Sequence, residues 1–111
     1  MTSLSPGTVA WAWLDPVVGK EQAGRRPVVV ISSTEYADIV TDLVIVMPLT
    51  RIDRGWDNHV PLTGVPELPA SFVMTEQPRT VSRDRLKGTI GAADASCVAQ
   101  LRLWIDRFLA L

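Results

Sequence analysis

The sequence predicts a mainly β fold, a small β-barrel packed by one C-terminal helix. Short apolar runs such as residues 28–31 and 43–47 lie between turn residues, which is typical of strands. The period of the apolar residues changes after Asp94, where they recur at helical spacing. The chain has 111 residues, enough for one compact domain, so residues 1–111 are expected to form a single unit.

The first expected strand carries the largest side chains. Val9, Trp11 and Trp13 alternate with smaller residues, and this period of two predicts a strand with one aromatic face. We expect both tryptophans to lie in the core or at a dimer interface. Residues 17–26 contain two glycines and are expected to form a long loop.

The other strands are expected where β-branched or apolar residues lie between turn residues. They cover residues 28–31, 43–47, 59–62, 71–77 and 87–90, with an irregular continuation at 78–81. A helical turn is expected near residues 35–37, and a charged loop at 51–58. The final helix is expected to have Asp94 as its N-cap and to bury a stripe formed by Val98, Leu101, Ile105 and Phe108.

Composition excludes several classes of protein. One cysteine, Cys97, leaves no internal disulfide or multi-cysteine zinc site, and one histidine, His59, leaves no two-histidine metal motif. The net charge is −1, unlike the strongly basic balance of most nonspecific nucleic-acid binders. No apolar run approaches the roughly 20 residues of a membrane span, and the N-terminus lacks the pattern of a secretory signal. A cytoplasmic protein without metal or other cofactor is therefore expected.

Four blocks of the sequence resemble the MazF/PemK toxin family. They read WLDPVVGKEQAGRRPVVV at 13–30, VIVMPLT at 44–50, EQPRTV at 76–81, and then Arg85-Leu86 with Ile90-Gly91 before the helix. The blocks follow the order and spacing of the family. The resemblance implies an SH3-like β-barrel that forms a homodimer and binds RNA along a groove across the dimer interface.

The same resemblance implies the activity and the partners. It implies a sequence-specific, metal-independent endoribonuclease, an mRNA interferase that cleaves single-stranded RNA by 2′-OH attack and leaves a 2′,3′-cyclic phosphate and a 5′-OH. It also implies the toxin of a type II toxin–antitoxin system, inhibited by a MazE-like antitoxin whose extended, often acidic tail occupies the RNA groove.

Arg26 and Thr50 match the catalytic positions of the family. A guanidinium offers paired donors to phosphate oxygens, and a threonine hydroxyl can donate to a nonbridging oxygen. Glu76 falls where the PemK branch has an aspartate, so it is a candidate base or supporting residue. The other two positions of that branch are changed here to Lys20 and Met74. The pair of Arg26 and Thr50 is therefore the preferred assignment.

The candidates for RNA binding lie in the matched loops and in the charged loop at 51–58. They are Lys20, Glu21, Gln22, Arg25, Trp56, Gln77, Arg79 and Thr80. Trp56 is a candidate for stacking on an unpaired base, and an exposed tryptophan can equally serve antitoxin binding. A second basic cluster, Arg83, Arg85 and Lys87, either lines the groove or faces solvent. His59 matches no catalytic position and is expected to be a strand-edge residue.

Two alternatives remain open from the sequence. The first is a non-enzymatic toxin that resembles CcdB and inhibits DNA gyrase through its terminal helix, with no requirement for Arg26 or Thr50. The second is a degenerate barrel that only binds an antitoxin, which the poorly matched segment 51–70 keeps open.

Overall fold

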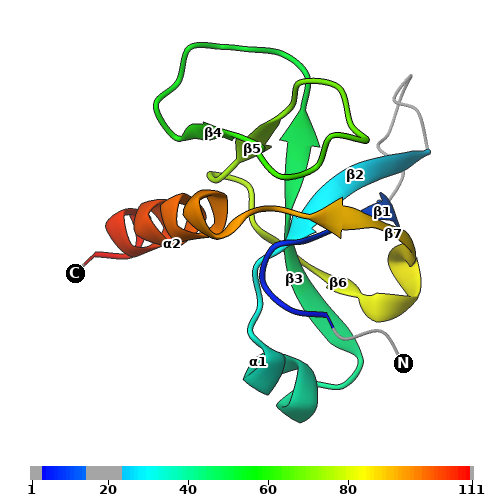
Figure 1. Cartoon of the computed structure of the whole chain (residues 1–111). Helices are drawn as coiled ribbons and strands as arrows, with labels where there is room; N and C mark the ends of the chain where they lie inside the picture. The colour runs from blue at the N-terminus through cyan, green and yellow to red at the C-terminus, as the bar shows by residue number, and fades with distance from the viewer. Residues whose placement is uncertain (1–3, 15–23, 111) are drawn as a thin grey trace, which may run out of the picture.

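The computed structural model describes residues 4–14 and 24–110 (Figure 1). Within these ranges the chain is mainly antiparallel β-sheet with a C-terminal helix, as the sequence predicts. The strands are β1 (Thr8–Trp13), β2 (Arg25–Val30), β3 (Leu43–Thr50), β4 (His59–Pro61), β5 (Phe72–Met74), β6 (Arg79–Ser82) and β7 (Leu86–Ala92). The helices are α1 (Thr34–Ile39) and α2 (Ala95–Phe108), with a 3₁₀ turn at Arg83–Arg85. None of the described helices is long and apolar enough to cross a membrane.

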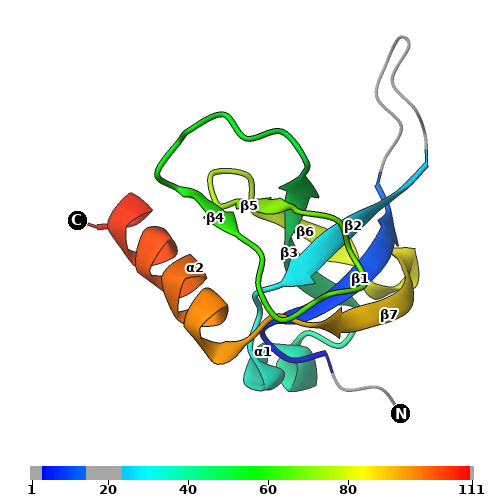
Figure 2. The same ribbon diagram turned by 45° about the horizontal axis from the view of Figure 1, so that its top comes forward.

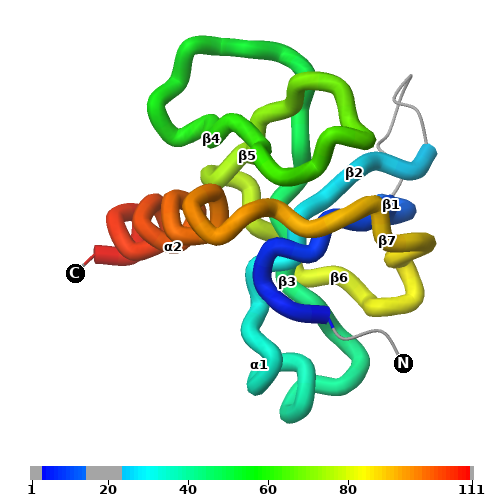
Figure 3. The backbone as a smooth tube through the Cα atoms, viewed as in Figure 1, coloured from blue at the N-terminus to red at the C-terminus, as the bar shows by residue number. Residues whose placement is uncertain are grey.

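The long strand β3 is the centre of the sheet. The strands lie in the order β4-β5-β3-β2-β1-β7, and β6 also pairs with β3. One edge of β3 pairs with β2, whereas the other pairs first with β6 and then, toward Thr50, with β5. Figure 1 shows β3 running through the middle of the molecule, with α1 at one end and β4 and β5 at the other. Residues 51–58 leave β3 at this second end and return as β4 (Figure 3).

Both faces of the sheet are covered by apolar side chains. Val29 and Met47 belong to one fully buried cluster, which also contains Leu101 of α2. Their neighbours Val28 and Val46 point to the opposite face and belong to a second cluster. Because both faces are buried, the strands read as nearly continuous apolar runs rather than alternating ones.

Asp94 caps α2, as predicted. Its Oδ1 accepts hydrogen bonds from the Cys97 amide at 3.0 Å and from the Thr63 hydroxyl at 2.8 Å. Leu101 is 2% exposed, but Phe108 is 51% exposed, so the predicted buried stripe ends before the last turn. Figure 2 shows α2 passing beside β4, with its C-terminal end farther from the sheet.

The boundaries of β2 and β5 differ from those expected. The strand β2 begins at Arg25, so residues 25 and 26 are not part of the loop predicted at 17–26. Pro27 lies opposite Trp11 of β1, while pairing with β3 begins at Val28. Proline therefore occupies a position where the strand has a neighbour on one side only, and its missing N–H is tolerated there.

The expected strand at 71–77 ends at Met74. The pairing of Leu49 with Val73 would place Glu76 opposite Val46, but Arg79 lies there instead. Three residues are therefore looped out of the sheet between β5 and β6. This turn carries Glu76 away from the strand and toward β4.

Candidate active site

Arg26 and Thr50 lie just beyond the paired part of the neighbouring strands β2 and β3. The last paired residues on this side are Val28 and Pro48, and both strands continue two residues further, to Arg26 and Thr50. Arg26 is exposed and Thr50 is half-buried. Side chains two residues apart on a strand share a face, so both residues continue the face of Val28 and Pro48. Both predicted catalytic residues thus lie at the ends of neighbouring strands, where the pairing of β2 with β3 has ended.

The hydroxyl of Thr50 is held by the backbone that follows it. Its Oγ1 accepts a hydrogen bond from the Ile52 amide at 3.2 Å. A hydroxyl that accepts one bond can still donate its proton elsewhere. Thr50 also pairs with Phe72 of β5, which fixes its position within the sheet.

Arg25 belongs to the opposite face from Arg26. Its guanidinium carbon lies 4.5 Å from the centre of the Trp11 ring, and its strand partner is Trp13. Trp11 is half-buried and Trp13 is 44% exposed. The apolar cluster beneath α2 includes Val9 but neither tryptophan, so of the two predicted places the core is wrong and the dimer interface stays a prediction.

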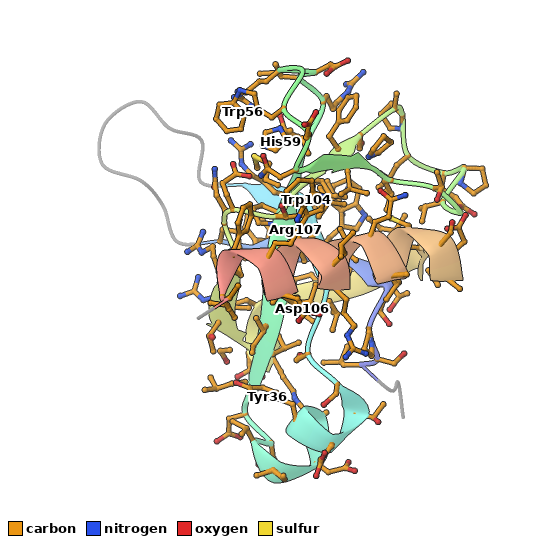
Figure 4. All side chains as sticks on the ribbon, turned by 90° about the vertical axis from the view of Figure 1, so that its left-hand side faces the viewer. Tyr36, Trp56, His59, Trp104, Asp106 and Arg107 are labelled. Atoms are coloured by element: carbon orange, nitrogen blue, oxygen red, sulfur yellow. The ribbon has the colours of Figure 1, made fainter. Side chains whose placement is uncertain are left out.

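The loop at 51–58 presents Trp56 to solvent. Trp56 is 51% exposed, and its ring centre lies 4.8 Å from that of His59, with the planes tilted by 47°. An Asp53 carboxylate oxygen accepts from the Gly55 amide at 2.9 Å, which closes a turn just before the tryptophan. Figure 4 shows Trp56 and His59 close together at the β4 end of the molecule.

Glu76 and His59 form the polar centre beneath this loop. The two carboxylate oxygens of Glu76 lie 3.0 and 3.1 Å from His59 Nε2, and the Asn58 amide donates to the same carboxylate at 2.8 Å. The hydroxyl of Thr75 donates to the Asn58 carbonyl at 2.7 Å. Partial burial raises the pKa of Glu76, but hydrogen bonds from His59, its own backbone and Gln77, together with attraction to His59, outweigh this effect. The pKa of Glu76 is therefore lowered.

His59 is the functional candidate that the sequence does not indicate. It lies on the edge strand β4, as expected, yet it is only 5% exposed, and its Nδ1 is buried without a hydrogen-bond partner among the described residues. Its partner Glu76 lies 17 positions later in the chain. No local spacing predicts such a pair, because the looped-out turn between β5 and β6 creates it.

The remaining predicted binding residues are divided between several places. Gln77 is exposed, and its side-chain amide donates to Glu76 at 3.3 Å. Arg79 and Thr80 lie on β6, opposite Val46 and Ile45. Lys20, Glu21 and Gln22 lie outside the described residues.

The three side chains of the second basic cluster, Arg83, Arg85 and Lys87, differ in their surroundings. Arg83 donates to the backbone carbonyls of Leu43 and Ala37, and so joins the 3₁₀ turn to β3 and α1. Arg85 donates to the Trp13 carbonyl at 3.1 Å. Only Lys87 is fully exposed. Arg83 is therefore neither a groove-lining nor a solvated side chain, because its guanidinium is tied to the backbone.

The structure places Glu76 apart from the pair of Arg26 and Thr50. It lies four residues beyond Phe72, the strand partner of Thr50, on the turn that follows β5. Within the described ranges, no three His, Cys, Asp or Glu side chains gather closely enough to hold a metal ion. The described part of the molecule thus has two candidate centres, one around Arg26 and Thr50 and one around Glu76, His59 and Trp56.

Comparison with known proteins identifies relatives over most of the chain. Residues 5–109 match the family model described as PemK-like, MazF-like toxin of type II toxin–antitoxin system. The chain is 38% identical over 58 residues to the endoribonuclease toxin MazF of Escherichia coli K12, covering 52% of this chain and 51% of that protein. It is 32% identical over 83 residues to the endoribonuclease PemK of Escherichia coli, covering 72% of this chain and 62% of that protein. The chain thus spans about half the length of the first curated relatives it matches.

Solved structures match the whole fold. MazF from Deinococcus radiodurans superposes with a TM-score of 0.81 at 26% identity, covering 100% of both chains. A chain of the MazE–MazF complex of the same organism gives a TM-score of 0.84 at 26% identity, covering 100% of this chain and 99% of that one. The Mycobacterium tuberculosis toxin MazF-mt6 gives 0.75 at 27% identity, covering 94% and 97%.

Proposed function

The chain belongs to the family of PemK-like, MazF-like toxins of type II toxin–antitoxin systems, and we propose that it is a sequence-specific, metal-independent endoribonuclease that cleaves single-stranded RNA. The observation that carries the proposal is that Arg26 and Thr50 occupy the ends of the neighbouring strands β2 and β3, just beyond the last paired residues Val28 and Pro48. A guanidinium and a hydroxyl on one face of an open strand end are suited to a phosphate group.

The reaction proposed for this site needs little from the protein. The substrate's own 2′-OH attacks the adjacent phosphorus, the bond from phosphorus to the 5′-oxygen breaks, and a 2′,3′-cyclic phosphate and a 5′-OH result. The 2′-OH loses a proton and the leaving oxygen gains one. The protein must position the phosphate and stabilise the dianionic phosphorane between these steps.

We assign this stabilisation to Arg26 and Thr50. The guanidinium of Arg26 can donate two parallel hydrogen bonds to the nonbridging oxygens, and a guanidinium that stays protonated has no lone pair with which to act as the base. The Thr50 hydroxyl already accepts from the Ile52 amide, so its own proton is available for the same phosphate. Glu76 supports the site from a distance.

RNA binding, regulation and assembly belong to the same proposal. We assign RNA contacts to Arg25, Trp56, Gln77, Arg79 and Thr80, and to Lys20, Glu21 and Gln22 outside the described residues. Messenger RNA is the proposed substrate, a MazE-like antitoxin the proposed inhibitor, and the cytoplasm the proposed compartment. The match over residues 5–109 supports a single toxin domain at 1–111. The exposed apolar end of α2, with Leu109 72% exposed, supports a homodimer.

The first test is cleavage of a long single-stranded RNA by the purified protein in EDTA. Wild-type protein is expected to cut at discrete positions and leave 5′-OH ends. Arg26→Ala is expected to lower the rate by roughly 10²–10³-fold, because it removes a charged donor to the phosphorane. Arg102→Ala, an exposed residue of α2, is the matched control and is expected to cut like the wild type. Equal cutting by Arg26→Ala would refute the site assignment.

A CcdB-like gyrase inhibitor is the second candidate function. The half-exposed side chains of Leu103 and Phe108 on α2 favour it, because a CcdB-like toxin would contact gyrase through its terminal helix. Intact RNA after incubation with folded protein, together with inhibition of DNA supercoiling by gyrase, would support this candidate over the nuclease.

A further inference from the structure

Trp56 is held on one side and open on the other. Its ring packs against His59 at 4.8 Å between centres, and the His59 amide donates to the Trp56 carbonyl at 3.1 Å. The tryptophan nevertheless keeps 51% of its surface exposed. A large apolar ring that is fixed from behind and open to solvent is suited to stacking on a planar ligand.

His59 is in turn fixed by Glu76. The imidazole side chain is only 2% exposed, and its Nε2 lies within 3.1 Å of both carboxylate oxygens. An ionised carboxylate only accepts, so Nε2 carries the hydrogen of this pair. The buried Nδ1 has no partner among the described residues, and such burial is destabilising, so packing alone does not explain this histidine.

Glu76 also holds the loop directly. The side-chain amide of Asn58 donates to it at 2.8 Å, and that residue lies between Trp56 and His59. The backbone carbonyl of Asn58 accepts from the Thr75 hydroxyl, which is part of the same turn as Glu76. The Glu76 carboxylate, on the turn between β5 and β6, thus binds the side chains of both Asn58 and His59.

We propose that Glu76 and His59 are positioning residues that fix Trp56 as a stacking platform for an unpaired base of the RNA substrate. The inference rests on the proposed endoribonuclease function and names how this second centre serves it. Through Phe72 of β5, Thr50 is in register with Pro61 of β4, two strand spacings or about 10 Å away, and His59 lies two residues from Pro61 on the same strand. A base on Trp56 would therefore belong to a nucleotide near the phosphate held by Arg26 and Thr50, but not to the scissile position itself.

The same geometry opposes a role for Glu76 as the base that removes the 2′-OH proton. Its two oxygens already accept from His59, Asn58 and Gln77 side chains. A carboxylate stabilised by three neighbouring side chains is a weaker proton acceptor. It also lies on the turn after β5, four residues beyond the strand partner of Thr50, rather than at the strand end that carries Thr50.

Binding to an uncleavable probe tests the platform without the chemistry. The probe is a fluorescein-labelled 2′-O-methyl RNA of mixed sequence, whose blocked 2′-oxygen cannot attack, and the readout is fluorescence anisotropy. Trp56→Ala is expected to raise the Kd by roughly five- to a hundredfold, the range for loss of one stacked base. Trp56→Phe is expected to retain most of the affinity. Ile39→Ala, an exposed apolar residue on α1 at the other end of the molecule (Figure 1), is the control and is expected to bind like the wild type.

A double-mutant cycle tests whether Glu76 acts through Trp56. Glu76→Gln keeps the shape of the side chain but removes the charge that holds His59 and Asn58, so the Kd is expected to rise severalfold. The double variant Glu76→Gln/Trp56→Ala is expected to bind no more weakly than Trp56→Ala alone. With a cleavable RNA, Glu76→Gln is expected to raise KM while kcat stays within about threefold of the wild type. Glu76→Asp, which keeps the charge, is expected to restore part of the affinity, and thermal unfolding of each variant verifies folding.

The outcomes separate the inference from the proposed function. Additive losses in the double variant, or a lower kcat with unchanged Kd in Glu76→Gln, would overturn the positioning role while leaving the nuclease intact. Unchanged binding by Trp56→Ala would overturn the platform. A wild-type protein that neither binds the probe nor cuts RNA would overturn both the inference and the function on which it rests.

Discussion

The carboxylate of Glu76 makes stability depend on pH in a direction that can be worked out. Burial raises its pKa, but the bonds from His59, its backbone and Gln77 lower it further than burial raises it, so the folded pKa lies below the ordinary value of 4.5. The folded state therefore binds this proton less readily than the unfolded state. The stabilisation of the folded state by the ionised Glu76 carboxylate is fully present above the ordinary pKa, and it is lost as the pH falls through the folded pKa.

We expect the difference in unfolding free energy between the wild type and Glu76→Gln to be constant near neutral pH and to shrink on acidification below about pH 4. Urea unfolding between neutral and acidic pH measures it. The pKa of Asp94 is also lowered, chiefly by the Thr63 hydroxyl, but Asp94 is present in both proteins, so its contribution cancels and the difference reports on Glu76 together with its partner His59. A difference that stayed constant throughout acidification would contradict the lowered pKa.

Single residues differ in how well the sequence predicts them. Arg26 and Thr50 are candidates because they stand in sequence blocks that resemble the MazF/PemK family, and both lie just beyond the paired residues of β2 and β3. The pairing of His59 with Glu76 is not predictable, because it depends on a turn that connects distant segments. The sequence therefore indicates the first candidate centre and only isolated members of the second.

At the scale of elements, the sequence period predicts where the strands lie. It does not predict where a strand is interrupted or which of its faces is exposed. The strand expected at 71–77 stops at Met74, and only the competing pairings of β5 and β6 along β3 reveal the interruption. The alternation of Trp11 and Trp13 is real, yet the small Ala12 points into the valine-rich cluster. A narrow interior lined by β-branched residues accepts a methyl group but not an indole.

The junction between β7 and α2 depends on Gly64. Its φ of +92° is a left-handed conformation, and an added Cβ would lie 2.7 Å from the Asp94 nitrogen, which is backbone. Gly64→Ala would therefore suffer both strain and a clash beside the helix N-cap. We expect it to lower the free energy of unfolding by about 2 kcal/mol or more.

Urea unfolding checks this expectation, with Gly88→Ala as the matched control. Gly88 also has a positive φ, +133°, but an added Cβ there meets nothing within 4 Å. The control thus carries the backbone strain without the clash. If both variants lost the same stability, close packing at Gly64 would contribute nothing.

For the whole molecule, a net charge of −1 means that any affinity for RNA must come from local placement of arginines rather than from the overall balance. Arg25 and Arg26 are neighbours in sequence but point to opposite faces of β2, and Arg25 already lies over the Trp11 ring. An RNA backbone that runs along one face of β2 therefore cannot contact both guanidinium groups in the same way. The face that continues through Arg26 and Thr50 is the one assigned to the scissile phosphate.

Salt dependence distinguishes the two arginines. Each phosphate contact to a single strand contributes roughly 0.7 to the slope of log K against log salt concentration. We expect Arg26→Gln to reduce this slope by roughly 0.7 for each protomer that engages the RNA, and Arg25→Gln to reduce it less. The measurement is anisotropy of the 2′-O-methyl RNA probe over a series of KCl concentrations, with Arg102→Gln on the exposed side of α2 as the control of equal charge change. A slope left unchanged by Arg26→Gln would mean that its guanidinium does not contact phosphate, and the catalytic assignment would lose its electrostatic basis.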